Sequence, residues 1–216
     1  MKARIKFAKR DSMKFVGHLD IMRYFQKAIR RANIDIKYSE GYSPHQIMSF
    51  AAPLGVGLES EAEYFDIELN SSSPPEQMIA ALNAVMADGI EVLDFIQLED
   101  KSKNAMSLVS AADYQIVFRD AYRPDIDLNQ EIKHFYEQDE IIILKKTKKN
   151  EKEVNIKPMI YKLSADQNSV YMQLATGSVN NLKPELVMQA FYQYLNKEMP
   201  KFAFTVKRLE LYLNGK

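Results

Sequence analysis

The order in which strand-like and helix-like segments follow one another repeats once along this chain of 216 residues. Residues 2–8 alternate polar and apolar side chains, as a strand with one buried face does. A helix is expected over 18–32, because apolar side chains recur there at spacings of three and four. The remaining segments of this half are a strand at 47–57, a strand at 62–69 after a polar turn at Glu59 and Ser60, a helix from Pro74 to Ala87, and a strand at 90–98. This order is that of a split βαβ, or ferredoxin-like, unit.

The second half repeats this order after a polar stretch at 101–110, which has no periodic pattern and is expected to be a linker. One additional strand is expected here. The segments are a strand at 114–119, a helix at 128–138, strands at 141–146, 154–163 and 170–174, a helix at 184–195 and a strand at 202–213. The sequence therefore predicts an α+β fold of two tandem ferredoxin-like units, 1–100 and 111–216, whose antiparallel sheets carry helices on one face.

Composition narrows the classes of function. The chain has no cysteine, which excludes disulfides, thiolate zinc sites and iron–sulfur clusters held by this chain alone, and which fits the reducing cytoplasm. No apolar run reaches the length of a membrane span, and no signal peptide is expected. No zinc-protease, nucleophile-elbow or phosphate-loop motif occurs, so we expect no cofactor, no metal and no catalysis by the chain itself. A metal site would require His18, His45 and carboxylates to converge, which the sequence leaves open.

Charge is separated along the chain although the formal net charge is zero. Residues 1–33 hold ten basic and two acidic side chains, whereas residues 59–100 hold eleven acidic and no basic ones. One interpretation is a dipolar molecule with a face that attracts anions. The other is that adjacent strands bring the two segments together and neutralise them, and the sequence leaves both open.

The expected helix at 18–32 carries a basic face. Arg23, Lys27 and Arg30 lie opposite the apolar stripe, and Arg31 lies at its edge. Such cations suit phosphate contacts, since each neutralised phosphate releases counterions. The structural alternative is a solvated face whose cations favour the helix C-terminus. A lysine-rich segment at 145–152 is interpreted as a solvated sheet edge and not as an RNA contact.

Two histidines are candidates for chemistry. His18 and Asp20 lie in the first turn of the same helix, where a carboxylate is also favourable for the helix itself. His45 closes the loop 38–45, which holds Tyr38 and Tyr42 as well. Aromatic rings stack on bases, and a histidine donates to phosphate or acts as an acid or base. The alternative is that the tyrosines pack on the sheet and the polar residues form turns.

Several motifs that follow one another in a fixed order resemble the bacterial radical-SAM-associated family of unknown function. They are the segments 15–20, 30–32, 38–45, 49–54 and 60–64. Members of that family are often fused to, or encoded beside, a cobalamin-binding radical SAM protein. The resemblance is strong over residues 1–70 and looser beyond, where 156–158 is similar to a family element.

The resemblance implies an accessory binding module with a radical SAM protein as its partner, and the family context points to RNA, a tRNA or rRNA element. On this hypothesis the basic helix face positions phosphates, the loop 38–45 contacts a base, and the first helical turn orients the pocket. The candidate substrate-binding residues are His18, Asp20, Arg23, Lys27, Arg30, Arg31, Tyr38, Ser39, Tyr42, His45, Ser60 and Glu63. The alternatives are a protein-interaction domain that docks a radical SAM subunit through a sheet edge or the acidic 59–100 segment, and a ribonuclease that uses its histidines.

Overall fold

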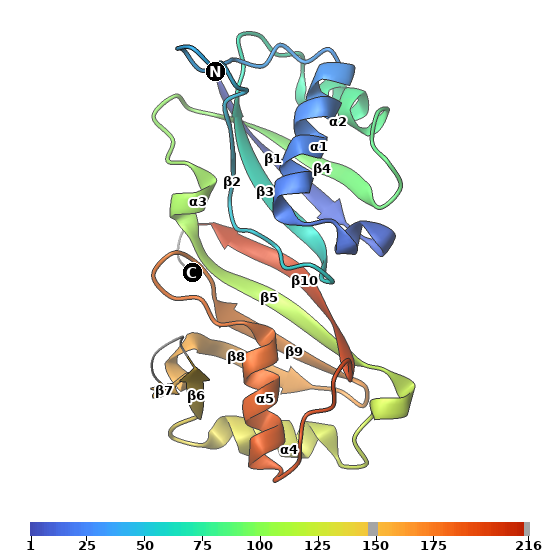
Figure 1. Cartoon of the computed structure of the whole chain (residues 1–216), viewed down its shortest axis with the longest axis vertical. Helices are drawn as coiled ribbons and strands as arrows, with labels where there is room; N and C mark the ends of the chain where they lie inside the picture. The colour runs from blue at the N-terminus through green and yellow to red at the C-terminus, as the bar shows by residue number, and fades with distance from the viewer. Residues whose placement is uncertain (147–150, 214–216) are drawn as a thin grey trace. The chain divides into compact units, whose positions relative to one another are not determined.

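The computed structural model describes residues 1–146 and 151–213 and has a mixed α+β fold, with mostly antiparallel strands and five α-helices in that part of the chain (Figure 1). The chain divides into two compact units, one of residues 1–110 and 208–216 and one of residues 111–207. Strand β10 (Phe204–Leu213) is therefore shared. Its residues from 208 onward belong to the first unit, whereas the sequence pattern assigned all of it to the second. The centre of the lysine-rich segment, 147–150, lies outside the described residues.

The sheet of the first unit is centred on β1 (Lys2–Lys9). β1 pairs antiparallel with β3 (Glu59–Glu68) and with β4 (Ile90–Leu98), so that Ile5 stands opposite Phe65 on one side and Phe95 on the other. β2 (Met48–Phe50) pairs with the far side of β3, giving the order β4-β1-β3-β2. β10 also neighbours β3.

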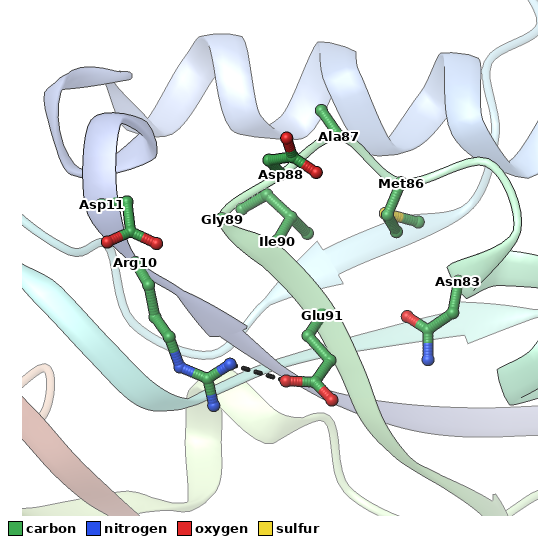
Figure 2. A pocket seen from close by; sticks show the side chains of 9 residues that line it. All are labelled: Arg10, Asp11, Asn83, Met86, Ala87, Asp88, Gly89, Ile90 and Glu91. Carbon is green, nitrogen blue, oxygen red and sulfur yellow. Dashed lines mark hydrogen bonds and ion pairs between the residues drawn. The ribbon is translucent and has the colours of Figure 1, made fainter.

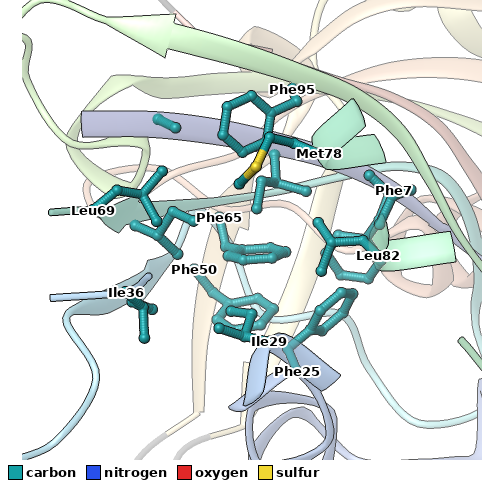
Figure 3. Close-up of a cluster of buried hydrophobic side chains, with 14 of the residues drawn as sticks. Phe7, Phe25, Ile29, Ile36, Phe50, Phe65, Leu69, Met78, Leu82 and Phe95 are labelled. Atoms are coloured by element: carbon teal, nitrogen blue, oxygen red, sulfur yellow. The ribbon is translucent and has the colours of Figure 1, made fainter. Parts of the chain in front are cut away.

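Two helices of this unit, α1 (His18–Arg31) and α2 (Pro75–Asn83), bury their apolar stripes against the same core as the sheet. The centre of that core is aromatic, with the rings of Phe7, Phe25 and Phe65 packed together (Figure 3). The Phe25 ring centroid lies 4.7 Å from those of Phe7 and Phe65. Burying one such ring stabilises the fold by about 1.5–3 kcal/mol. The expected strand at 2–8, helix at 18–32 and strand at 90–98 are confirmed.

Three predictions in this unit are wrong. The expected strand at 47–57 ends at Phe50, because Pro53 lacks an amide proton and Gly57 takes a left-handed φ of +88° in the loop that follows. β3 already begins at Glu59, so the polar turn expected there is part of a strand. Helix α2 ends at Asn83 and not at Ala87, and the Asn83 side-chain amide hydrogen-bonds both backbone groups of Val92 on β4. The expected linker also holds a short helix, α3 (Ala105–Leu108).

The second unit repeats the arrangement with an insertion. Its sheet has the order β5 (Val109–Phe118), β9 (Ser169–Ala175) and β8 (Ile160–Ala165), with the first residues of β10 beside β5. The Phe135 ring of α4 (Leu128–Glu137) packs 5.5 Å from the Phe191 ring of α5 (Pro184–Tyr194). The expected strand at 154–163 is wrong, since a 3₁₀ turn at Lys157–Met159 interrupts it. The elements are β5 (Val109–Phe118), α4 (Leu128–Glu137), β6 (Ile142–Lys146), β7 (Glu151–Asn155), β8 (Ile160–Ala165), β9 (Ser169–Ala175) and α5 (Pro184–Tyr194).

Membrane crossing by a helix finds no support in the described residues, because none of their helices combines the required length and apolarity.

Candidate cationic site on helix α1

Four basic side chains of β1 and the turn after it, those of Arg4, Lys6, Arg10 and Lys14, form ion pairs with acidic side chains. Lys14 pairs with Glu59 at 3.1 Å, and Arg10 bridges Glu61 and Glu91. These hydrogen bonds raise the pKa of the Arg10 guanidinium above its ordinary value. Two further pairs follow along β1, Arg4 with Asp66 and Lys6 with Glu210. For this part of the chain, neighbouring strands do bring the basic and acidic segments together.

The exposed face of α1 differs, since two of its cations have no polar partner of any kind among the described residues. Lys27 and Arg30 are exposed, and their side chains make no hydrogen bond or ion pair with the described residues. Arg23 pairs with Asp20 at 3.3 Å, but both side chains are about two-thirds exposed and such a pair contributes little. Arg31 turns away and donates to the Val85 backbone carbonyl at 3.0 Å. Lys27 and Arg30 are therefore the cations of this face that are free to bind an anion, and Arg31 adds a positive charge that no carboxylate neutralises.

The loop 38–45 is a closed turn. Tyr38 and Gln46 form an antiparallel bridge, and the Ser39 amide donates to the His45 carbonyl at 2.8 Å. The Ser39 hydroxyl accepts from the His45 amide at 3.1 Å and is hydrogen-bonded to His45 Nδ1 at 2.9 Å. Tyr42, beside Gly41 with its φ of +107°, is fully exposed at the tip. The hydrogen bonds between Ser39 and His45 therefore stabilise the conformation of the turn.

Gln46 fastens this turn to α1. Its side chain is buried, and its Nε2 donates to the Gln26 backbone carbonyl at 3.1 Å and to the Tyr38 hydroxyl at 3.4 Å. Gln26 lies between Arg23 and Lys27 on the helix, and Arg30 follows one turn later. Because an α-helix rises about 5.4 Å per turn, the base of the turn is anchored beside the cationic face. Sequence reasoning did not identify Gln46.

His18 does not share a contact with His45. The His18 ring packs edge-on against Phe50, with centroids 5.3 Å apart, and the contacts of His45 are with Ser39 and the Ser43 carbonyl. In the described residues, no group of three or more histidines and carboxylates is placed to hold a metal ion. The geometry therefore gives a histidine-pair ribonuclease no support.

Ser60 and Glu63 lie inside the first unit and not on its surface. The Ser60 hydroxyl, fully buried, accepts from the Ala62 amide at 3.1 Å. Both oxygens of Glu63 accept from Arg208 Nη1, at 2.8 and 3.1 Å, and both side chains are 5% exposed. These residues contribute to packing and to a buried ion pair, whereas the sequence motifs predicted contacts to a substrate.

A buried lysine, Lys9, lies close enough to the Glu63–Arg208 pair to feel the charge of Glu63, and the three residues form the buried charged cluster. Lys9 is 2% exposed, and its Nζ donates to the carbonyls of Val16 and Lys14 at 2.8 and 3.3 Å. Burial lowers the pKa of Lys9, and the charge of Glu63 partly offsets that effect. Sequence reasoning missed Lys9, although the period-two pattern places it on the buried face with Ile5 and Phe7.

A pocket of about 400 Å³ lies elsewhere in the first unit, beside the turn that starts β4 (Figure 2). Arg10 and Glu91, which form an ion pair, line it together with Asp11 and Asp88. None of the twelve candidate residues belongs to its lining. The candidate site is thus an exposed helix face with an aromatic turn, and not this pocket.

The fold and this site define a mixed α+β protein with a cationic helix face and a projecting aromatic turn. Residues 2–184 match the family described as "Uncharacterized protein conserved in bacteria (DUF2344)", and the chain belongs to that family. No curated protein matches the sequence.

Among solved structures, the protein is similar to a chain of the "Crystal Structure of a Cbf5-Nop10-Gar1 Complex", with a TM-score of 0.51 and 10% sequence identity. The likeness covers 97% of this protein and 48% of that chain, so this protein spans about half of its length. At this identity the likeness concerns the fold alone.

Proposed function

We propose that this protein is an accessory module that binds RNA through the exposed face of α1, on behalf of a radical SAM modification enzyme. The observation that carries the RNA part is the pair of cations at Lys27 and Arg30, which no carboxylate neutralises, on a face next to an aromatic turn. Unpaired guanidinium and ammonium groups bind phosphate without first breaking an ion pair. The tRNA or rRNA element and the radical SAM partner are supported by the sequence motifs.

We also propose that both units are ferredoxin-like. When strands are numbered within each unit, leaving the β6-β7 hairpin aside, the orders β4-β1-β3-β2 and β10-β5-β9-β8 are the same. Each unit also places one helix after its first strand and one before its last. This agreement supports a duplicated split βαβ unit.

RNA binding is tested by titrating labelled small RNA at several salt concentrations. The variant is Lys27→Glu with Arg30→Glu, and the matched control is Lys162→Glu with Lys183→Glu, two exposed lysines of the second unit. We expect the wild type and the control to bind with a steep salt dependence. The variant should bind more weakly, with a slope of log K against log salt reduced by about 1.4–1.8, since each lost phosphate contact accounts for about 0.7–0.9.

Equal affinity and equal slope for the variant and the wild type would remove the proposal. The enzyme partner is tested separately, by co-purifying a radical SAM protein from extracts with and without ribonuclease. Recovery that ribonuclease abolishes would indicate joint binding to one RNA. Recovery that ribonuclease leaves unchanged would indicate direct docking.

A further inference from the structure

The tip of the turn 38–45 carries an aromatic ring that does not pack against the described part of the fold. Tyr42 is fully exposed, and its ring makes no ring contact within the described residues. The backbone around it is nevertheless held by the Tyr38–Gln46 bridge and the Ser39–His45 hydrogen bonds. A ring presented on an ordered turn loses little conformational freedom when it stacks on a ligand, so this geometry suits binding.

The positive charge beside the turn indicates which class of aromatic ligand would bind there. Gln46 joins the base of the turn to Gln26, and the unneutralised cations Lys27 and Arg30 lie within one helical turn of Gln26. A ligand that meets both features has flat rings and several negative charges in one flexible chain. Nucleic acid has this combination, and stacking on tyrosine tolerates any base because every base has a π-face.

Stacking also selects the form of the nucleic acid. In a duplex the faces of the bases are covered by their neighbours, and an A-form major groove is too narrow for side chains to enter. An unpaired base in a loop, bulge or tail leaves its face free. We propose, building on the proposed function, that the turn 38–45 is a platform for an unpaired base of single-stranded RNA, with Tyr42 stacking on the base while Lys27 and Arg30 hold the flanking phosphates.

His45 and Tyr38 complete the platform at its base. The His45 ring is hydrogen-bonded through Nδ1 to Ser39 and exposed to solvent, and its Nε2 makes no hydrogen bond within the described residues. Tyr38 is 45% exposed, and its hydroxyl accepts from Gln46. Both side chains are held within the turn before any ligand arrives.

A fluorescence experiment tests the platform directly. The chain contains no tryptophan, so Tyr42→Trp introduces a single indole at the tip of the turn. The probes are a ten-nucleotide single-stranded RNA of mixed sequence and the same RNA annealed to its complement. We expect the single strand to quench the indole at saturation and the duplex to bind more weakly with little quenching.

Affinity variants separate the platform from the phosphate contacts. Tyr42→Ala should weaken single-strand binding by about 5- to 140-fold, as the loss of one stacked base does. Tyr42→Phe should keep nearly all affinity, because stacking needs the ring and not the hydroxyl. Tyr161→Ala, at a tyrosine 48% exposed in the second unit, is the matched control and should bind like the wild type.

The outcomes distinguish this proposal from the one on which it rests. Weakening by the Lys27 and Arg30 charge reversals, with no effect of Tyr42→Ala, would leave RNA binding in place and overturn the platform. Equal affinity for single strand and duplex would also overturn it. Absence of any RNA binding by the wild type would overturn both proposals.

Discussion

Removal of the Glu63 charge is expected to destabilise the first unit strongly. Both oxygens of Glu63 accept from Arg208 Nη1, the two side chains are 5% exposed, and Lys9 lies in the same buried charged cluster. Glu63→Gln keeps the shape of the side chain but removes the negative charge that faces two buried cations, Arg208 and Lys9. Breaking one partner of such a buried pair costs about 3–5 kcal/mol of unfolding free energy.

The assay is urea denaturation followed by far-ultraviolet circular dichroism. Glu59→Gln is the matched control, because Glu59 lies on the same strand and pairs with Lys14 at 3.1 Å, but both of those side chains are 28% exposed. A partly solvated pair of this kind contributes about 0–1 kcal/mol. A loss for Glu63→Gln no larger than that for Glu59→Gln would refute the reasoning.

A double variant, Glu63→Met with Arg208→Met, separates the net value of the pair from the penalty of leaving one charge behind. Replacing both members of a buried pair with apolar residues is often close to neutral. The double variant should therefore be more stable than Glu63→Gln. If it were less stable, the favourable interaction within the pair, and not the penalty of removing only one of its two charges, would account for the loss in Glu63→Gln.

Two further predictions concern single positions. Gly89→Ala should destabilise more than Gly57→Ala by about 1–3 kcal/mol in urea denaturation. Both glycines have a φ of +88°, but only at Gly89 would a Cβ meet a backbone atom, the Arg10 carbonyl oxygen at 2.6 Å; equal losses would contradict the steric argument. Hydrogen bonds from the side chains of Asn70 and Ser71 lower the pKa of Asp35 below its ordinary 3.8. Its contribution to stability should therefore be present above that value and lost as pH falls through the folded pKa. Asp35→Asn should remove this part of the acid dependence of the urea midpoint; an unchanged profile would contradict it.

Long periodic segments could be read from the sequence because their pattern is set by the core. The alternation in β1 and the apolar stripe of α1 each recur often enough to identify one buried face. β2 was predicted too long because residues 51–57 are mostly apolar but form a loop and not a strand. Two side chains of this loop, those of Ala51 and Leu54, are buried in the core. Apolar composition reports burial, and burial does not require a strand.

Periodicity also explains which part of the candidate site the sequence could predict. Helical spacing alone places Lys27 and Arg30 on the exposed face. It cannot say which cations find a carboxylate, since that depends on contacts between distant segments. The partner of Glu63 is 145 residues away in the sequence, and no local pattern points to it.

That separation has a consequence for how the protein is made. A ribosome that adds about 5–20 residues per second completes Arg208 roughly 7–30 s after Glu63. By the end of this interval the ribosome has made the helices and the strands β1 to β4 of the first unit, but the Glu63 carboxylate still lacks the Arg208 guanidinium. The first unit is therefore begun first and completed last, because all of residues 111–207 are synthesised before Arg208.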